Sequence, residues 1–387
     1  MVKAIKVMLI PNNVQKTKMF QYAGASRFAY NWALAREKEN YEKGGRFISD
    51  SELRKEFTKL RHSDEYAWLL SISNNVTKQA IKDACTAYKN FFKGLQKFPR
   101  FKSRKRSMPK FYQDNVKIQF SNTHVKFEGF SSSRKANKQK MNWVRLAEHG
   151  RIPIDANYMN PRISFDGLNW WISVCVEFPD CRETLNDDGV GIDLGMKDFA
   201  VCSDAVKYKN INKSQKVKKL EKQKRRLQRS ISRSYEKNKK GESYCKTDHV
   251  IKKEKLLLKR NHRLINIRKN YLNQTVSEIV NRKPRFICIE DLNVSGMMKN
   301  RHLSKAVQEQ GFFLFRKQLE YKCSDKGIQL IVADRFYPSS KLCSCCGNIK
   351  KDLKLSDRVY RCECGNMIDR DFQASINLKA YGERFAS

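Results

Sequence analysis

The first hundred residues are dominated by apolar positions that recur at the spacing of a helix. In residues 14–43 aromatic and aliphatic side chains return every three to four positions, and a Gly-Gly pair ends the run. Ser49 and Glu52 have the spacing of a capping box, so we expect a second helix to begin there. A third helix should span residues 75–95. Residues 13–99 are therefore predicted to form a helical domain.

The pattern changes to the alternation of strands on either side of this helical region. Residues 3–10 alternate at the start of the chain, and residues 110–178 contain two pairs of alternating runs, joined at an Asn-Thr and an Asp-Gly turn. These strands together predict a small β-barrel that is interrupted by the helices. The neighbouring Trp170 and Trp171 should point to opposite faces, so one should be in the core and the other could stack on a base.

The second half of the chain alternates short apolar strands with helices, which is typical of a mixed α/β core. Residues 189–201 predict a hairpin of two strands. A buried strand at residues 286–289, a helix at 304–322 and a strand from Ile328 follow. Between the hairpin and these elements, residues 212–282 have the roughly heptad spacing of two helices in an antiparallel hairpin.

A polar, turn-rich segment separates the two halves and marks a domain boundary. A chain of 387 residues is long enough for two or three domains, each with its own core. The predicted organisation assigns residues 1–12 and 100–180 to the barrel, 13–99 to the helical domain, 181–188 to the linker and 189–387 to the α/β domain, which includes the helical insertion at 212–282 and a metal ribbon at 338–368.

The charge balance indicates a polyanionic partner. The chain carries 79 Lys and Arg residues against 40 Asp and Glu residues, a formal net charge of +39 at pH 7. A heteroduplex of ~20 base pairs carries ~40 phosphates, so this excess has the size needed to hold one in a channel. Solubility alone would not need so much charge, but net charge does not distinguish DNA from RNA.

The sequence contains neither a membrane span nor an export signal that we can recognise. It has no run of ~18 apolar residues, and its first apolar segment becomes polar too soon for a signal peptide. We therefore expect a cytoplasmic protein with reduced thiols and no membrane partner.

Four cysteines near the C-terminus have the spacing of a zinc ribbon. Cys343 and Cys346 form a C-x-x-C pair, which is followed by a glycine. Cys362 and Cys364 follow as a shorter C-x-C pair, again with a glycine behind it. Four thiolates satisfy tetrahedral Zn²⁺, so the predicted zinc is structural rather than catalytic. A disulfide pair is the alternative, which a reducing compartment disfavours, and Cys345 offers a spare ligand.

Acidic residues stand at the ends of several predicted elements. Asp193 and Glu290 each end a short apolar strand. Asp369 and Asp371 stand at the start of the last predicted helix. One acid at a strand end is common in turns and means little alone. Three separated acids can converge if the fold brings the strand ends together, and clustered carboxylates are the ligands that Mg²⁺ prefers.

Four ordered motifs resemble a known family. The stretches GIDLGMKDFAV, ICIEDLNVSGM, PSSKLCSCCG and CECGNMIDRDFQASINLK are similar to the three RuvC segments and the zinc ribbon of TnpB, the OrfB protein of bacterial insertion sequences. TnpB in turn resembles the compact type V CRISPR effectors. The resemblance implies an α/β plus β-barrel fold. An RNase H-like RuvC nuclease domain with inserted helices and a zinc ribbon would follow an oligonucleotide-binding wedge barrel with an inserted helical recognition domain.

For the acids, the resemblance implies a nuclease centre. Asp193, Glu290 and Asp371 would bind two Mg²⁺ ions, with Asp193 bridging both. Asp371 matches the second aspartate of the family's DRDxN motif, which leaves Asp369 a supporting role such as a helix cap. Gln373 stands where that motif has asparagine, a change that keeps the amide.

The resemblance also implies residues that contact nucleic acid. Lys78 and Gln79 match positions expected to read a short DNA motif beside the target, where Gln can pair with adenine and Lys with guanine. The segment FPRFKSR resembles a family element in which Arg100, Lys102 and Arg104 would clamp a nucleic-acid backbone. The alternative for this segment is an exposed basic loop.

The function that the resemblance implies is RNA-guided cleavage of DNA. A monomer would bind one guide RNA derived from the transposon end, pair that RNA with double-stranded target DNA, and cut next to the flanking motif. The alternatives are a repressor that binds without cutting, a type V CRISPR effector and a true transposase. A repressor would be expected to have lost one of the acids, and all three are present.

Overall fold

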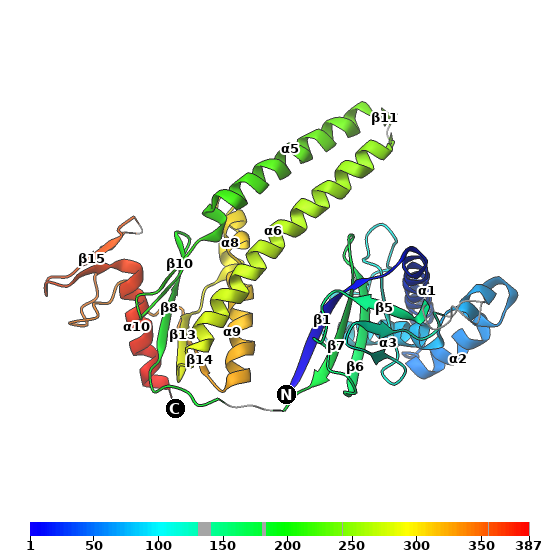
Figure 1. The fold of residues 1–387 in the computed structure, drawn as a ribbon, viewed down its shortest axis with the longest axis horizontal. Helices are drawn as coiled ribbons and strands as arrows, with labels where there is room; N and C mark the ends of the chain where they lie inside the picture. Colours follow the sequence, from blue (N-terminus) through cyan, green and yellow to red (C-terminus); the bar gives the residue numbers. More distant parts are fainter. Residues whose placement is uncertain (131–140, 180–182, 242, 355, 387) are drawn as a thin grey trace. The chain divides into compact units, whose positions relative to one another are not determined.

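The chain forms two compact units, Met1–Pro179 and Asp180–Ser387 (Figure 1). The computed structural model describes residues 1–130, 141–179, 183–241, 243–354 and 356–386. The predicted linker at 181–188 begins at this division, although residues 181 and 182 lie outside the described residues. Within the described ranges, no helix combines the length and the apolar character that crossing a membrane requires.

The first unit contains a seven-stranded sheet in which all neighbours are antiparallel. Its strands are β1 (Val2–Ile10), β2 (Lys110–Tyr112), β3 (Gln119–Phe120), β4 (His124–Lys126), β5 (Trp143–Leu146), β6 (Tyr158–Phe165) and β7 (Trp170–Glu177). They lie in the order β2-β6-β7-β1-β5-β4-β3. The predicted first strand and both predicted hairpins are confirmed. Because β1 pairs with β7, the start and the end of this unit meet at the centre of the sheet.

Three helices share one hydrophobic core with this sheet. They are α1 (Asn13–Glu42), α2 (Asp50–Arg61) and α3 (Asn74–Phe92), with a 3₁₀ helix at Asp64–Ser71 between the last two. The predicted capping box is formed. The Ser49 hydroxyl accepts the backbone N–H of Glu52, and the Glu52 carboxylate accepts the backbone N–H of Ser49 at 2.9 Å. The local sequence therefore fixes where α2 begins.

The two neighbouring tryptophans lie on opposite faces of β7. Trp170 is 2% exposed and packs in the core against Phe165. Trp171 is partly exposed. Its indole N–H donates to Asp166 at 2.7 Å, and the Lys6 amine lies over its ring. Trp170 is therefore the core residue of the pair.

The second unit is built on a five-stranded mixed sheet. Its strands are β8 (Val190–Leu194), β9 (Asp198–Cys202), β10 (Lys207–Lys209), β13 (Phe286–Glu290) and β14 (Gln329–Ala333), in the order β10-β9-β8-β13-β14. The strands β8, β9 and β10 are antiparallel neighbours, whereas β13 runs parallel to both β8 and β14. The predicted hairpin, the predicted buried strand at 286–289 and the predicted strand from Ile328 are confirmed, and β8 lies at the centre of the sheet.

Helices cover this sheet and extend from it (Figure 1). They are α5 (Gln215–Lys237), α6 (Asp248–Asn281), α7 (Val294–Met297), α8 (Ser304–Gln310), α9 (Phe312–Lys326) and α10 (Arg370–Phe385), with a 3₁₀ turn at Ile211–Lys213. The prediction of one helix over 304–322 is wrong, because the chain breaks into α8 and α9 at Gly311. The φ of Gly311 is +74°, in the left-handed region that glycine adopts readily.

The insertion folds as the predicted antiparallel hairpin of α5 and α6, with the short strands β11 (Lys239–Lys240) and β12 (Ser243–Tyr244) at its tip (Figure 1). A small core near its base consists of Val217, Leu220 and Leu264. Beside this core, Arg268 of α6 forms ion pairs with Glu221 of α5 at 3.1 Å and with Glu309 of α8 at 3.3 Å. The base of the hairpin is thereby attached to the body of the unit.

The last helix, α10, crosses the sheet at a glycine. A Cβ atom at Gly191 of β8 would lie 2.1 Å from the backbone oxygen of Ser375 and 2.3 Å from the backbone nitrogen of Lys379. Further along the helix, a Cβ atom at Gly382 would lie 2.3 Å from the ring of Phe286 on β13. Helix and sheet therefore touch backbone to backbone, and the position of α10 over the sheet is fixed.

We expect Gly191→Ala to lower the free energy of unfolding by about 1–3 kcal/mol, because the added methyl group overlaps backbone atoms that cannot rotate away. Urea unfolding of the full chain measures the change. Gly24→Ala is the matched control, because Gly24 lies within α1 and an added Cβ meets nothing within 4 Å. That control should leave the protein unchanged or stabilise it by about 0.5–1 kcal/mol. Equal effects of the two substitutions would contradict the close contact.

A buried carboxylate in α1 makes the first unit sensitive to pH. Glu37 is 4% exposed, and one of its oxygens finds no hydrogen-bond partner in the described part of the chain. Burial raises the pKa of Glu37 from 4.5 to about 7, although the hydrogen bond from the backbone N–H of Ile48 and the charge of Lys89 each lower it. The folded state thus binds this proton more tightly than the unfolded state does. The resulting stabilisation is full below pH 4.5 and is lost as the pH rises through about 7.

We therefore expect Glu37→Gln to stabilise the protein at pH 8, by about 1–3 kcal/mol, and to have little effect near pH 4.5. Thermal unfolding at a series of pH values measures the difference between the variant and the wild type. Glu42→Gln, at an exposed position of the same helix, is the control. A difference that stays constant from pH 4.5 to 8 would show that Glu37 is not the titrating group.

Candidate active site and metal centre

Two of the predicted acids meet because their strands are parallel neighbours. In the ladder of β8 and β13, Ile192 pairs with Ile289, so Asp193 and Glu290 follow side by side. Neighbouring strands are ~4.8 Å apart, which brings both carboxylates to one edge of the sheet. Both residues are partly exposed, and both line a pocket of about 310 Å³.

The third predicted acid reaches this pocket from α10. Asp371 lies in the first turn of the helix and lines the pocket with Asp193 and Glu290. It precedes Ser375 by one helical turn, and the Ser375 backbone touches the sheet at Gly191. Asp193 lies two residues beyond Gly191 on β8. The contact at the glycine therefore determines how near the two aspartates come.

Asp369 caps α10, as predicted. Its carboxylate accepts the backbone N–H groups of Asp371 and Phe372, both at 3.1 Å, and the Lys207 amine lies 3.4 Å away. Burial alone would raise the pKa of Asp369. The hydrogen bond from the Phe372 backbone and the charge of Lys207 outweigh burial and hold this pKa below its ordinary value. Asp369 is thus committed to the helix end, whereas Asp371 faces the pocket.

Two of the pocket carboxylates, Glu290 and Asp371, oppose the ionisation of Asp193. Burial raises the pKa of Asp193 well above its ordinary value, and Glu290 and Asp371 raise it further, against the opposing charge of Arg370. Burial also raises the pKa of Glu290, as does Asp371, although hydrogen bonds with Ser339 and Asp193 act in the other direction. A cation bound among these oxygens would remove the repulsion, which makes the cluster suited to a metal.

A serine that the sequence analysis did not single out orients Glu290. The hydroxyl of Ser339 donates to a Glu290 carboxylate oxygen, and Ser339 is 4% exposed. Asn377 of α10 donates to the backbone oxygens of Ser339 and Leu342, each at 2.7 Å. The PSSKLC motif contains this serine, but no local pattern tells which strand end its loop will reach.

Basic side chains surround the acids and were also missed. Those that line the pocket are Lys197, Lys341, Lys354, Arg358 and Arg370. They come from the β8–β9 turn, from the segment between β14 and β15 (Val359–Arg361), and from the start of α10. Cations grouped beside clustered carboxylates are suited to hold the phosphates of a nucleic acid. Their only sequence signal is the high overall content of Lys and Arg.

The four predicted zinc ligands form one cluster. The sulfur atoms of Cys343, Cys346, Cys362 and Cys364 all lie within 4.8 Å of one another. The distances are 3.6 Å from Cys343 to Cys364 and 3.5 Å from Cys346 to Cys362. A disulfide would need ~2.05 Å, whereas a zinc ion with Zn–S bonds of ~2.3 Å separates its sulfurs by roughly 3.8 Å. The arrangement thus fits a tetrahedral zinc site, and the exposed Cys345 is not part of it.

Within the cluster, the surroundings of Cys343 favour the thiolate that a metal binds, whereas, against backbone hydrogen bonds from Asn348 and Asn366, neighbouring thiols raise the pKa values of Cys346 and Cys364. The Asn366 amide donates to the Cys343 sulfur at 3.4 Å. Burial alone would raise the pKa of Cys343. Hydrogen bonds from the Cys346 backbone and from Asn366 outweigh burial and lower this pKa to about 6. The thiolate, which is the form that binds zinc, is therefore available near neutral pH.

Gln373 attaches the cysteine ribbon to α10. Its amide N–H donates to the backbone oxygen of Leu342 at 2.7 Å. Its carbonyl oxygen accepts from the Ser344 hydroxyl at 2.9 Å and from the Asn366 amide at 3.3 Å. Gln373 is fully buried, so these bonds hold the ribbon and the helix that carries Asp371 as one piece.

Two of the residues predicted to contact nucleic acid lie on α3 and have different surroundings. Lys78 is exposed. The Gln79 amide donates to Asp83 at 2.9 Å, and Asp83 forms a bidentate ion pair with Arg162 of β6 at 2.6 and 3.0 Å. The amide donor of Gln79 is therefore already engaged, whereas Lys78 presents its charge to solvent.

The basic segment after α3 also divides into inward and outward side chains. Arg100 and Arg104 are exposed. The Lys102 amine lies 2.9 Å from the centre of the Tyr30 ring, and burial lowers its pKa to about 7. The backbone of Lys102 exchanges two hydrogen bonds of 2.8 Å with the Asn31 amide. Lys102 thus anchors the loop, and the two arginines extend from it.

Three family models match this chain. One described as "Probable transposase" matches residues 173–301, one described as "Helix-turn-helix domain" matches residues 1–46, and one described as "Cas12f1-like, TNB domain" matches residues 312–378. The segment matched by the second model folds here as strand β1 and the single long helix α1, so its description does not fit this structure. The third segment contains the cysteine cluster and Asp371.

Similarity to single proteins extends over nearly the whole chain. A protein of Escherichia coli (strain K12) named "Putative RNA-guided DNA endonuclease InsQ" is 29% identical over 98% of this chain and 92% of its own length. A Streptomyces pristinaespiralis protein, named as an endonuclease of the same kind, is 28% identical over 98% of this chain and 89% of its own. The Cas12f1 chain in a complex with guide RNA and target DNA shares the fold, with a TM-score of 0.59 over 98% of both chains at 12% identity. The matched models and the near-complete similarity to these relatives support the assignment of the chain to the TnpB (OrfB) family of insertion-sequence proteins.

Proposed function

We propose that this protein is an RNA-guided endonuclease that cleaves double-stranded DNA beside a short flanking motif. The observation that carries the proposal is the convergence of Asp193, Glu290 and Asp371 on one pocket from three separate segments of the chain. The proposal is supported by the names of two relatives, each of which is called a "Putative RNA-guided DNA endonuclease". The second unit would then be an RNase H-like RuvC domain, and the first unit a wedge with an inserted recognition domain.

The three carboxylates are suited to two Mg²⁺ ions. Their oxygens are hard ligands, and because burial raises the pKa values of Asp193 and Glu290, a cation bound among them would favour their ionised forms. When bound, such a metal pair supplies an activated water and neutralises the leaving oxygen. Asp193 would hold these ions together with Glu290 and Asp371, because both of those carboxylates lie near enough to raise its pKa.

The remaining pocket residues position the substrate and the acids. Lys341, Lys354 and Arg358 would bind phosphates on either side of the scissile bond. Ser339 holds the Glu290 carboxylate in one orientation. Gly191 lets α10 approach the sheet, which keeps Asp371 at the pocket.

The guide would be an RNA from the transposon end, bound by one chain, and the net charge of +39 suits such a partner. Sequence recognition would come from base pairing between this RNA and the target strand, while the protein reads the flanking motif. We assign Lys78 to that motif and Arg100 and Arg104 to a nucleic-acid backbone, since all three are exposed. Lys102 supports the loop instead.

Replacing any of the three acids by its amide should reduce DNA cleavage by at least about a hundredfold, because each amide removes one anionic metal ligand. The assay uses protein purified with its co-expressed RNA, a plasmid that carries the matched target, and Mg²⁺. Asp371→Asn and Asp369→Asn form the sharpest comparison. Asparagine still caps a helix, so Asp369→Asn should retain most of the activity.

Two results would contradict the assignment. Intact plasmid after incubation with the wild-type complex would refute nuclease activity on this substrate. Equal cleavage by the wild type and Asp193→Asn would refute the metal centre even if DNA is cut.

We also propose that the four-cysteine cluster holds one structural Zn²⁺. Cys343→Ser should reduce the bound zinc from one ion per chain toward none, lower the unfolding midpoint, and reduce cleavage, because the ribbon supports Ser339 and Asp371 through α10. Elemental analysis counts the metal. Cys345→Ser, at the exposed cysteine outside the cluster, should keep its zinc. Loss of zinc in Cys345→Ser alone would show that the ligand set is different.

A further inference from the structure

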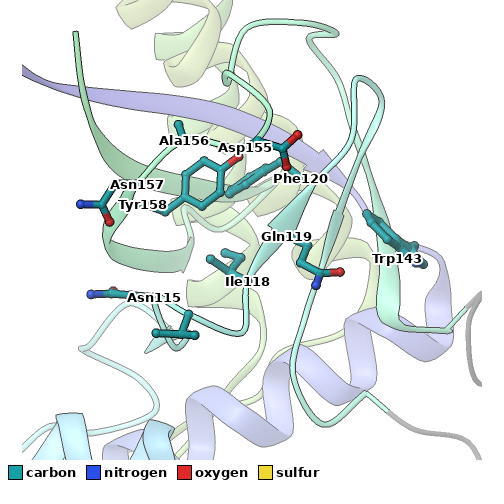
Figure 2. Close-up of a pocket in the computed structure, with 10 residues that line it drawn as sticks. Asn115, Ile118, Gln119, Phe120, Trp143, Asp155, Ala156, Asn157 and Tyr158 are labelled. Atoms are coloured by element: carbon teal, nitrogen blue, oxygen red, sulfur yellow. The ribbon is translucent and has the colours of Figure 1, made fainter.

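The first unit contains a pocket of about 520 Å³ to which the proposed nuclease chemistry assigns no role (Figure 2). It lies between the turn that precedes β3, the start of β5 and the loop that enters β6. Ile118, Phe120 and Tyr158 form its apolar floor, and all three are buried. The Tyr158 hydroxyl donates to the backbone oxygen of Pro153 at 2.7 Å, and its ring lies 4.7 Å from that of Phe120. The floor is therefore aromatic and held in place.

Amide groups line the rim of this pocket. The side-chain oxygen of Asn115 accepts the backbone N–H of Asn160 at 3.1 Å and the hydroxyl of Tyr112 at 2.9 Å. A backbone N–H requires an acceptor, so the orientation of this amide is fixed and its NH₂ group is the part left to donate. Asn157 is exposed, and its amide bonds to no residue that the structure describes. Asn115 and Asn157 lie on the same side of Tyr158 in the view of Figure 2.

The backbone around the pocket is strained. Asp155 and Asn160 have φ values of +57° and +49°, in the left-handed region, although neither is glycine. Asn160 also lies where the ladder of β6 and β7 is irregular, between Met159 and Arg162. Such conformations cost energy and concentrate at binding sites, where the surrounding structure maintains them. Here the hydrogen bond from the Asn160 backbone to the Asn115 side chain is one of the contacts that maintain the left-handed conformation of Asn160.

A basic and aromatic strip continues from the pocket across the sheet. Gln119 pairs with Lys126, and Lys126 pairs with Trp143, so the three side chains lie on one face of β3, β4 and β5. The Lys126 amine donates to Gln119 at 3.1 Å and lies 5.9 Å from the centre of the Trp143 ring. Arg145 follows two residues after Trp143, on the same face, and is exposed. Both Gln119 and Trp143 also line the pocket.

We propose that this pocket binds one unpaired nucleobase of the guide RNA, a site that reads or holds a single extruded nucleotide. The proposal rests on the proposed function, since it requires the chain to bind RNA. A phosphate does not suit the interior, because Asp155 is the one charged residue among the described residues that line it, and it is negative. A flat neutral ring suits the aromatic floor.

The hydrogen-bonding groups match the edge of such a base. The Asn115 NH₂ group can donate to a ring nitrogen or carbonyl, and the Asn157 amide can both donate and accept. Outside the pocket, Lys126 and Arg145 would meet the flanking phosphates, and Trp143 would stack on the next base. RNA loops present unstacked bases of this kind, whereas a DNA duplex keeps its bases stacked and paired.

Chemical probing of the purified protein–RNA complex tests the proposal. Reagents that together modify the pairing edges of all four unpaired bases, namely dimethyl sulfate, kethoxal and a water-soluble carbodiimide, are applied to free RNA and to the complex. We expect one unpaired base to be protected by the wild-type protein. In Asn157→Trp the indole fills the pocket, so the same base should return to the reactivity that it has in free RNA, while the other protections remain.

Asn122→Trp is the matched control, because Asn122 is an exposed asparagine in the turn between β3 and β4 of the same sheet and does not line the pocket. It should leave the protection unchanged, and both variants should unfold at the wild-type temperature. Asn115→Asp gives a second probe that preserves the fold. This substitution keeps an oxygen that accepts from Asn160 and Tyr112 but replaces the NH₂ donor with a second acceptor. The bound base should therefore regain part of its reactivity toward the reagents.

The outcomes separate this proposal from the proposed function. RNA that stays bound with identical protections in the wild type and in Asn157→Trp would overturn the pocket and leave the nuclease assignment standing. A base protected in the target DNA and none in the RNA would overturn the assignment of the occupant to RNA. Absence of any RNA from the purified wild-type chain would overturn the proposed function and this proposal together.

Discussion

The contact between α10 and the central strand at Gly191 is the constraint on which the second unit depends. A helix and a strand usually keep their backbones apart by the width of side chains, but here a Cβ atom would fall 2.1 Å from a helix carbonyl. That proximity brings an acid from the end of the chain to two acids on the sheet. The site cannot be assembled by local folding, because its three carboxylates lie 97 and 81 residues apart in sequence.

Placing Asp193, Glu290 and Asp371 close together is unfavourable for folding, and contacts elsewhere in the second unit offset this cost. Raised pKa values at Asp193 and Glu290 mean that the folded state resists the charged forms that metal binding requires. Hydrogen bonds from Ser339 and a capped helix hold the acids despite their repulsion. The cysteine ribbon takes part in this support through Gln373, so the four-cysteine cluster helps to hold the geometry of the three acids. Metal binding to the folded state should therefore add stability by mass action.

Much of this architecture could be predicted from the sequence, because local signals determine it. Alternating residues around short turns identified the hairpins, and the capping box at Ser49 located a helix start to the residue. Asp193 and Glu290 were each placed at the end of a strand, and the strands β8 and β13 that carry them are parallel neighbours. Their meeting could therefore be predicted. For the four cysteines, the sequence spacing was sufficient to predict that their thiols meet in one cluster, since four thiolates have few other structural uses.

Other features depend on contacts that no local pattern contains. The apolar repeat continues through Gly311, so the break between α8 and α9 was missed, although its left-handed φ needs a glycine. Lys102 belongs to the same basic run as Arg100 and Arg104, and only the fold turns it toward Tyr30. Ser339 could not be linked to Glu290, because its loop is positioned by α10 from farther along the chain.

The attachment of the helical insertion has a practical consequence for engineering. Arg268 joins both helices of the hairpin and α8 near its base, whereas β11 and β12 close its far end. The carboxylates belong to the sheet and to α10, so the outer turns of α5 and α6 contribute no ligand to them. Equal numbers of helical turns could thus be removed from both arms above Arg268, which would give a more compact protein for delivery vectors with limited cargo capacity.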